Sequence, residues 1–106
     1  MRSRVFYVSA VRYDVRSRSR IAALKVQYET GAPGDLNTLS VPQVATRKEV
    51  ERDIALTRLG YTVFSDASGH LDMGERVRIV RDSARSYLRG VPGDAYEDDL
   101  GDLPRF

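Results

Sequence analysis

Hydrophobic and polar positions predict two neighbouring strands near the start of the chain. Residues 5–13 are rich in β-branched and aromatic side chains at both alternating sets of positions, which is typical of a central strand. Residues 21–28 form a second apolar stretch with strand periodicity. A polar connection of hairpin length, residues 14–20, joins the two. We therefore expect the strands to pair antiparallel, with arginines crowded at the tip of the hairpin.

One helix is predicted in the middle of the chain. Thr46 and Glu49 have the spacing of a capping box, in which each side chain bonds the main-chain amide of the other residue. Apolar residues then recur at roughly helical spacing up to Leu59. Gly60 suits the left-handed position that follows many helix ends. The sequence therefore predicts a helix over residues 47–59.

Two further strands and an unusual ending complete the predicted fold. Residues 61–65 and 76–81 alternate in the manner of strands, and a turn signal, residues 66–69, follows the first of them. Residues 86–106 hold too many Gly, Pro and Asp for a helix or a central strand, yet large apolar side chains recur among them. We expect a single α+β domain, residues 1–106: a small antiparallel sheet in ββαββ order, one helix and a docked irregular C-terminal segment.

Composition limits the class of protein. With 106 residues, 42% of them hydrophobic, the chain supports one small core. It has no cysteine, which excludes disulfides and cysteine-bound zinc and favours the cytoplasm. No apolar run approaches the roughly 18 to 20 residues that cross a bilayer, and the basic start is too short for a signal peptide. We therefore expect no contact with membranes.

Charge is distributed unevenly, although the net charge is only +2. Residues 1–25 carry seven Arg or Lys against one Asp, whereas residues 90–106 carry five acidic residues against one Arg. Such an asymmetry serves an external anion, or it is neutralised internally with the acidic ending beside the basic hairpin. If the docked ending buries Arg89, a carboxylate such as that of Asp98 or Asp99 should meet it, because an unpaired buried charge is costly.

Several short motifs occur in order along the chain. They are Ala10-Val-Arg12, Ile21-Ala-Ala-Leu24, Val77-Arg-Ile-Val80, Tyr87-Leu-Arg89, Asp98-Asp-Leu100 and Leu103-Pro104. In this order they resemble a family of short bacterial and phage domains of unknown function, which end in Tyr-Leu-Arg, Asp-Asn-Leu and Leu-Pro. Asp99 stands where that family tends to have Asn, and the loop over residues 30–45 is longer than usual. The resemblance implies strands around one helix and carries no activity.

The arginines of the predicted hairpin are the candidate binding residues. Arg12, Arg16, Arg18 and Arg20 recur at alternate positions toward the tip, a spacing that would place several guanidinium groups along a phosphate backbone. The same arginines have a plainer interpretation, as solvated cations or as partners of the acidic ending. Both interpretations stay open at this point.

The sequence contains no pattern typical of a catalytic or metal site. His70 is the only histidine, and no nucleophile motif surrounds it. Residues 66–72 have ligand atoms at alternate positions but lack the acidic series and closing glutamate of a calcium loop. We therefore expect no enzymatic activity, no cofactor and no metal.

The function favoured by the sequence is a non-enzymatic binding or interaction module. Its surface would combine the arginine hairpin with the loop over residues 31–44, whose apolar side chains are unusual in a solvated loop. The partner would be another protein or a second copy of the chain in a homodimer. The alternative is a module that binds nucleic acid or a phosphorylated small ligand, such as a nucleotide, through the hairpin.

Overall fold

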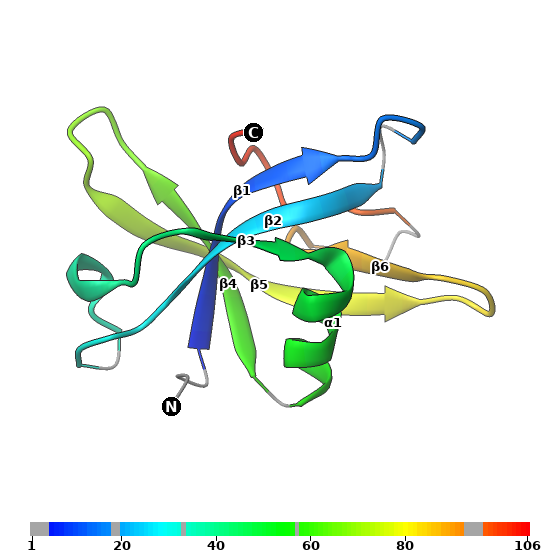
Figure 1. Ribbon diagram of the computed structural model, residues 1–106, viewed down its shortest axis with the longest axis horizontal. Helices are drawn as coiled ribbons and strands as arrows, with labels where there is room; N and C mark the ends of the chain where they lie inside the picture. Colours follow the sequence, from blue (N-terminus) through cyan, green and yellow to red (C-terminus); the bar gives the residue numbers. More distant parts are fainter. Residues whose placement is uncertain (1–4, 18–19, 33, 57, 93–96) are drawn as a thin grey trace.

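One mixed β-sheet dominates the computed structural model, which describes residues 5–17, 20–32, 34–56, 58–92 and 97–106. Six strands lie in the spatial order β3-β2-β1-β4-β5-β6 (Figure 1). The strands are β1 (Val5–Tyr13), β2 (Ile21–Tyr28), β3 (Gln43–Thr46), β4 (Leu59–Ser65), β5 (Leu71–Arg81) and β6 (Ser86–Arg89). The helices are α1 (Arg47–Ala55) and a short 3₁₀ helix, η1 (Leu36–Thr38).

The predicted antiparallel sheet in ββαββ order is wrong, although the coarser α+β class holds. β3 precedes α1 and β6 follows β5, so three strands lie on each side of the helix in the chain. β1 and β4 pair in parallel, while the other neighbouring strands pair antiparallel. The parallel pair arises because the connection through α1 returns the chain to the free side of β1 in the same direction. β3 and β6 have four residues each, too few for alternation to distinguish them from loop.

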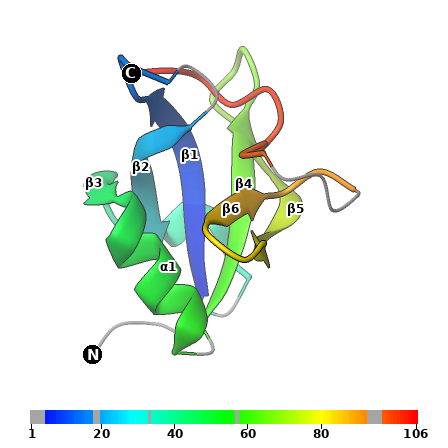
Figure 2. The ribbon, with the colours of Figure 1, turned by 90° about the vertical axis from the view of Figure 1, so that its right-hand side faces the viewer.

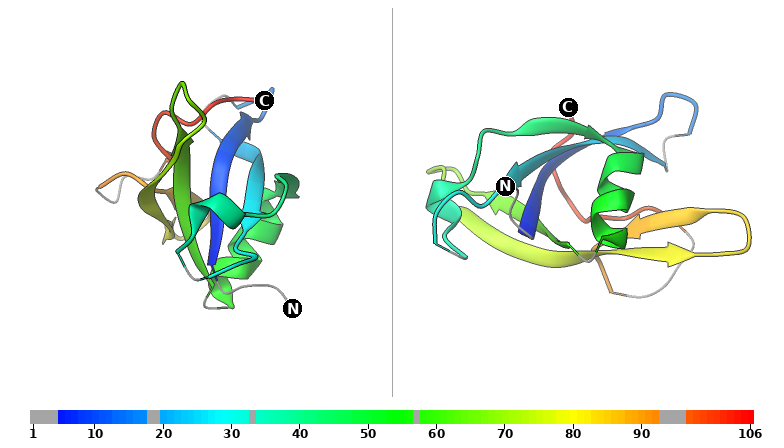
Figure 3. Two further views of the ribbon diagram at one scale, coloured as in Figure 1. Left: turned by 90° about the vertical axis from the view of Figure 1, so that its left-hand side faces the viewer. Right: turned by 60° about the horizontal axis from the view of Figure 1, so that its bottom comes forward.

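The core lies on the face of the sheet that α1 covers. α1 contacts β2, β3, β4 and β5, and it lies between the two splayed halves of the twisted sheet (Figure 3). The register of β1 with β2 shifts between Val8 and Ala10, so Ser9 is a bulged residue. Val8 and Val11 therefore both face the core, although they are three positions apart. This bulge explains why the core-facing positions of β1 change from one alternating set, with Val8, to the other, with Val11.

The helix begins as predicted and ends early. The Glu49 amide donates to Thr46 Oγ1 at 3.2 Å and the Thr46 amide to Glu49 Oε1 at 3.3 Å, which confirms the capping box. α1 ends at Ala55, and Gly60 already belongs to β4. A Cβ at Gly60 would collide with the ring of Phe6, so this glycine allows a close approach and does not cap the helix. No helix among the described residues is both long and apolar enough to cross a membrane.

A buried ion pair joins the helix to the C-terminal segment. Arg47, the first residue of α1, is 8% exposed and donates to both carboxylate oxygens of Asp98, with Nη2 lying 2.6 Å from Oδ1. The same guanidinium donates to the carbonyls of Ile21 and Ser86, at 3.0 and 2.8 Å. Asp98 in turn accepts from the amides of Ile21 and Leu88, at 2.7 and 2.9 Å. The pair thereby links α1, β2, β6 and the C-terminal segment.

The C-terminal segment runs from β6 back to β1 (Figure 2). Its first four residues form β6, and Leu100 and Leu103 beyond them are buried in the core. Isolated parallel bridges join Asp99 to Arg89 of β6 and Arg105 to Val11 of β1. The segment therefore bridges two strands that are not neighbours in the sheet.

A carboxylate meets the buried Arg89 as expected, but it belongs to Glu97 and not to Asp98 or Asp99. Arg89 is buried as anticipated, at 4% exposed, but it donates to the main-chain oxygens of Glu97 and Pro92. Its Nη1 also lies 3.7 Å from the carboxylate of Glu97. Successive side chains of an extended segment point to opposite sides, so Asp98 turns inward to Arg47 while Glu97 lies on the other side.

Replacing Asp98 with Asn should destabilise the protein by about 3–5 kcal/mol, because Arg47 then stays buried without its countercharge. Urea unfolding followed by circular dichroism would measure the change. The control is Asp102→Asn, an exposed acidic residue of the same segment, for which we expect a change within about 0.5 kcal/mol. Equal small effects of the two substitutions would contradict a stabilising role for the buried pair.

Truncating Leu100 to Ala should cost about 2–5 kcal/mol, because this fully buried side chain belongs to the core. Leu56→Ala is a matched control, since Leu56 is largely exposed at the end of α1. A melting temperature that falls for the first variant and stays near wild type for the second would bear out the docking of the ending. Unchanged melting of the Leu100 variant would refute it.

Candidate functional site

The four arginines predicted as binding residues lie in different surroundings. Arg12 is exposed on β1, and Arg16 is exposed in the turn that follows β1. The guanidinium of Arg20 donates to the carbonyl of Ser86 at 3.3 Å, beside the buried Arg47. Arg18 lies outside the described residues. The three described arginines therefore do not form one row along the hairpin.

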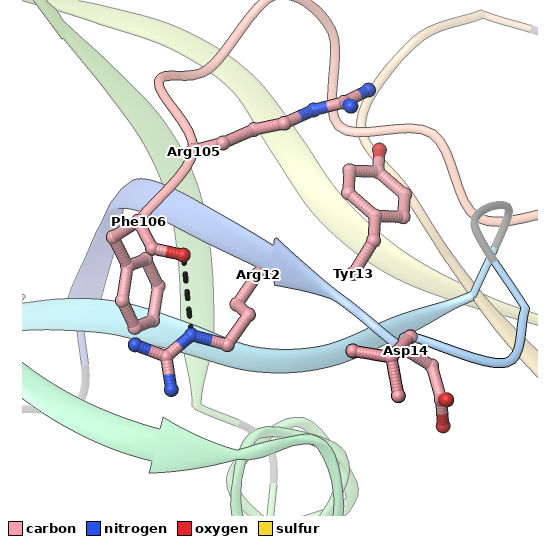
Figure 4. Close-up of a pocket in the computed structure, with 6 residues that line it drawn as sticks. Arg12, Tyr13, Asp14, Arg105 and Phe106 are labelled. Atoms are coloured by element: carbon pink, nitrogen blue, oxygen red, sulfur yellow. Dashed lines mark hydrogen bonds between the residues drawn. The ribbon is translucent and has the colours of Figure 1, made fainter.

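Arg12 lies in a group of cations held against aromatic rings. Its guanidinium carbon is 4.5 Å from the centre of the Phe106 ring, and its Nε donates to the main-chain oxygen of Phe106 at 3.1 Å (Figure 4). Lys25 Nζ lies 5.0 Å from the same ring, and the Arg105 guanidinium lies 4.6 Å from the centre of the Tyr13 ring. We call these five residues the cationic surface.

Pairing of the chain ending with β1 builds this surface. β4 pairs with β1 only as far as Val8, which leaves that side of β1 open beyond this point. There the Val11 amide donates to the Pro104 carbonyl at 2.9 Å, and the Phe106 amide donates to the Val11 carbonyl at 3.1 Å. Phe106 is thereby fixed beside Arg12, the residue after Val11.

Lys25 belongs to β2, and the register of β2 with β1 places it on the same face of the sheet as Arg12. It pairs with Ala10 across β1 and β2, and paired residues project from the same face of a sheet. Ala10 and Arg12 are two apart on one strand, so they share that face as well. The cations of Lys25 and Arg12 therefore approach Phe106 from neighbouring strands, on the face opposite to α1.

A shallow depression of about 540 Å³ lies at the surface, open to solvent. It is lined by Arg12, Tyr13, Asp14, Val15, Arg105 and Phe106 (Figure 4). Asp14 is engaged in the hairpin turn, where it accepts from the amide of Arg16 at 2.8 Å. The depression is an open shelf and not an enclosed pocket.

The cations of the surface have no acidic partner in the part of the chain that the structure describes. Arg12, Lys25 and Arg105 make no ion pair there. The acidic residues of the ending are used elsewhere, Asp98 by Arg47 and Glu97 by Arg89. The acidic ending thus forms no ion pair with these three cations, although the carboxylates of Asp99 and Asp98 act on the neighbouring Tyr13 and raise its pKa.

Stacking on a ring leaves a guanidinium able to bind. The flat face of the group lies on the aromatic ring, while the N–H donors point outward around its edge. Burial raises the pKa of the Tyr13 phenol, and the nearby Arg105 guanidinium opposes part of that rise. The phenol stays protonated at neutral pH, so Tyr13 adds no negative charge to the surface.

Sequence reasoning identified Arg12 and missed the residues around it. Lys25 was included in the charge count without a role, and Tyr13 was interpreted as a core or core-edge residue in preference to an exposed stacking face. Arg105 is the one cation among the acidic residues 90–106, a signal that could have drawn attention to it. Nothing in the sequence places Phe106 against Arg12, because the two residues are 94 positions apart in the chain.

The comparisons with known proteins add no relative: no family model matches the chain, and neither does a curated protein or a solved structure. The resemblance to short bacterial and phage domains therefore stays a prediction drawn from the motifs.

Replacing Arg105 with Gln should raise the pKa of Tyr13 further, because the positive charge that favours the phenolate is removed. An NMR titration of labelled tyrosine, with Tyr13→Phe to assign the resonance, would measure the shift. Arg52→Gln, on α1 at the other face of the sheet, carries the same loss of charge and should leave the titration unchanged. A Tyr13 pKa that does not respond to Arg105 would contradict the stacked geometry.

Proposed function

We propose that this chain is a non-enzymatic binding module that holds an anionic partner on the cationic surface. One observation carries the proposal: Arg12, Lys25 and Arg105 converge around two aromatic rings and make no ion pair within the described residues. Positive charges in a folded protein are ordinarily placed near carboxylates or spread into solvent. Three that are gathered and oriented, with no ion pair to a described carboxylate, favour a negative partner.

The geometry favours a phosphate-bearing strand as the partner. Guanidinium groups bond phosphate oxygens through paired N–H donors, and each such contact releases counterions from a nucleic acid. A compact nucleotide is better held by an enclosed pocket, whereas the depression here is open. The extended backbone of single-stranded nucleic acid therefore suits the surface better than a free nucleotide does.

The groups that line the depression favour binding over catalysis. Arginine does not give up its proton in proteins, so Arg12 and Arg105 supply fixed charge and hydrogen bonds, not proton transfer. His70 lies in the turn between β4 and β5, where its side chain is 64% exposed and its Nε2 is 3.5 Å from Asp72. The cysteine-free composition keeps the cytoplasm as the proposed compartment.

The proposal predicts salt-sensitive binding of a fluorescently labelled single-stranded oligonucleotide, measured by anisotropy. Three phosphate contacts give a slope of about −2 in a plot of log affinity against log salt. The double variant Arg12→Gln/Arg105→Gln should bind at least about tenfold more weakly, because two charged hydrogen-bonding groups are lost. Its slope should be shallower by about 1.4.

Matched controls test whether binding depends on the cationic surface or on positive charge anywhere on the protein. Arg52→Gln and Arg81→Gln change exposed arginines on α1 and β5 and should each leave affinity close to that of the wild type. The proposal fails if the oligonucleotide does not bind at low salt, or if the double variant binds as tightly as the controls. An acidic peptide that competes as well as an oligonucleotide of equal charge would replace nucleic acid with an acidic protein segment as the partner.

A further inference from the structure

The two edge strands of the sheet, β6 and β3, differ in whether their outer main-chain groups are paired. At one end, the C-terminal segment lies against β6, where the Gly90 amide donates to the Asp99 carbonyl and the Asp99 amide to the Leu88 carbonyl, at 2.7 and 2.8 Å. At the other end, β3 pairs with β2 on one side, and no described residue pairs with its other side. The strand register turns the main-chain groups of Gln43 and Ala45 toward β2 and those of Val44 and Thr46 outward. The Thr46 amide donates to Glu49, so Val44 supplies the donor and acceptor that a second strand can meet at this edge.

The open edge carries none of the charge that usually protects such strands. Residues 36–46 form the longest stretch without a charged residue, in a chain of which 30% is charged. Val41 and Val44 in this stretch are 78% and 61% exposed. Edge strands are ordinarily guarded by lysines, bulges or proline, and here Pro42, two residues before Val44, offers a carbonyl but no amide at the next outward position. Pairing at this edge would therefore be centred on Val44, with no charged side chain to oppose it.

We propose that β3 pairs antiparallel with β3 of a second copy of this chain, across a two-fold axis. A neutral strand meets its own copy without repulsion, whereas it offers a charged peptide no complementary charge. Pairing about a two-fold axis is self-complementary, and its antiparallel direction continues that of β2 and β3. The partner is therefore an identical chain, and two six-stranded sheets join into one.

The exposed charges of α1, which lies beside β3, do not oppose a second copy of the chain. α1 follows β3 directly, and its exposed residues include Lys48, Glu49 and Arg52, of both signs. A two-fold axis at β3 places the two helices on one face of the joined sheet, near one another. Cations of each helix can then face the glutamate of the other, so the charge pattern tolerates a second copy.

The pairing has a consequence for the cationic surface. Val44 pairs with Lys25, so its side chain lies on the face that carries this surface. Five strand spacings separate β1 from the partner's β1, about 24 Å in total. The dimer would thus present two cationic surfaces to one long polyanion, which raises affinity without any new contact. This consequence alone rests on the proposed function; the pairing of β3 does not.

Sedimentation equilibrium tests the pairing. The wild type should be a dimer, and Val44→Lys should be a monomer at the same concentration, because two lysines would meet at the axis. Val15→Lys is the matched control: Val15 is 94% exposed in the turn after β1 and is no part of β3, so this variant should stay dimeric. A wild type that is monomeric at every soluble concentration overturns the proposal, and so does a Val44→Lys variant that remains a dimer.

A distance measurement tests the edge independently of any loss of folding. The chain has no cysteine, so a single Val44→Cys or Met73→Cys substitution accepts one spin label per copy. Labels at position 44 should give a shorter distance between copies than labels at position 73 of β5. The reverse order would overturn pairing through β3.

Oligonucleotides of two lengths distinguish this proposal from the proposed function. Val44→Pro removes an amide from β3 and adds no charge beside Lys25, so it should bind a short oligonucleotide with the salt slope of the wild type and lose the additional affinity for a long one. A dimer that binds neither length would retain the β3 pairing and refute the phosphate-binding role. If Val44→Pro binds neither length, with its fold intact by circular dichroism, β3 and the cationic surface are not independent.

Discussion

A buried guanidinium–carboxylate pair holds together parts of this domain that the sheet does not join. Arg47 and Asp98 satisfy main-chain groups of β2 and β6, strands that stand four places apart in the sheet order. The contact is bidentate, the geometry in which attraction best offsets the cost of removing both charges from water. We infer that the pair selects one arrangement, because it forms only when α1 and the ending are both in place.

The cationic surface depends on the Arg47–Asp98 pair. Asp98 fixes the start of the described ending, Leu100 and Leu103 then enter the core, and the chain reaches β1 at Arg105 and Phe106. The same segment therefore closes the core and supplies two of the five residues of the cationic surface. The sequence suggested a purely structural ending, with function elsewhere. In the structure the two roles share one segment, so a change that releases the ending also removes the site.

Local signals in the sequence were reliable, and signals that depend on distant residues were not. β1 and β2 have the predicted bounds because alternation and a polar hairpin connection are local properties. Gly60 was misassigned because a glycine after an apolar helix stretch resembles a cap, and only the distant Phe6 ring reveals its role. The pairing of Asp98 with Arg47 instead of Arg89 depends likewise on which way one extended residue points. The parallel pair of β1 and β4 was missed because the sequence does not show on which side of β1 the chain returns after α1.

The cationic surface illustrates why spacing alone finds part of a site. Alternation in the hairpin indicated a row of arginines, but Arg12 projects toward Phe106 while Arg20 reaches the Ser86 carbonyl. What makes Arg12 a strong candidate is the ring beneath it. A solvated arginine must lose rotamer freedom when it binds, whereas one held on Phe106 has given up part of that freedom during folding. If the surface binds an anion as proposed, the aromatic rings contribute to affinity because they lower the entropic cost of ordering each cation.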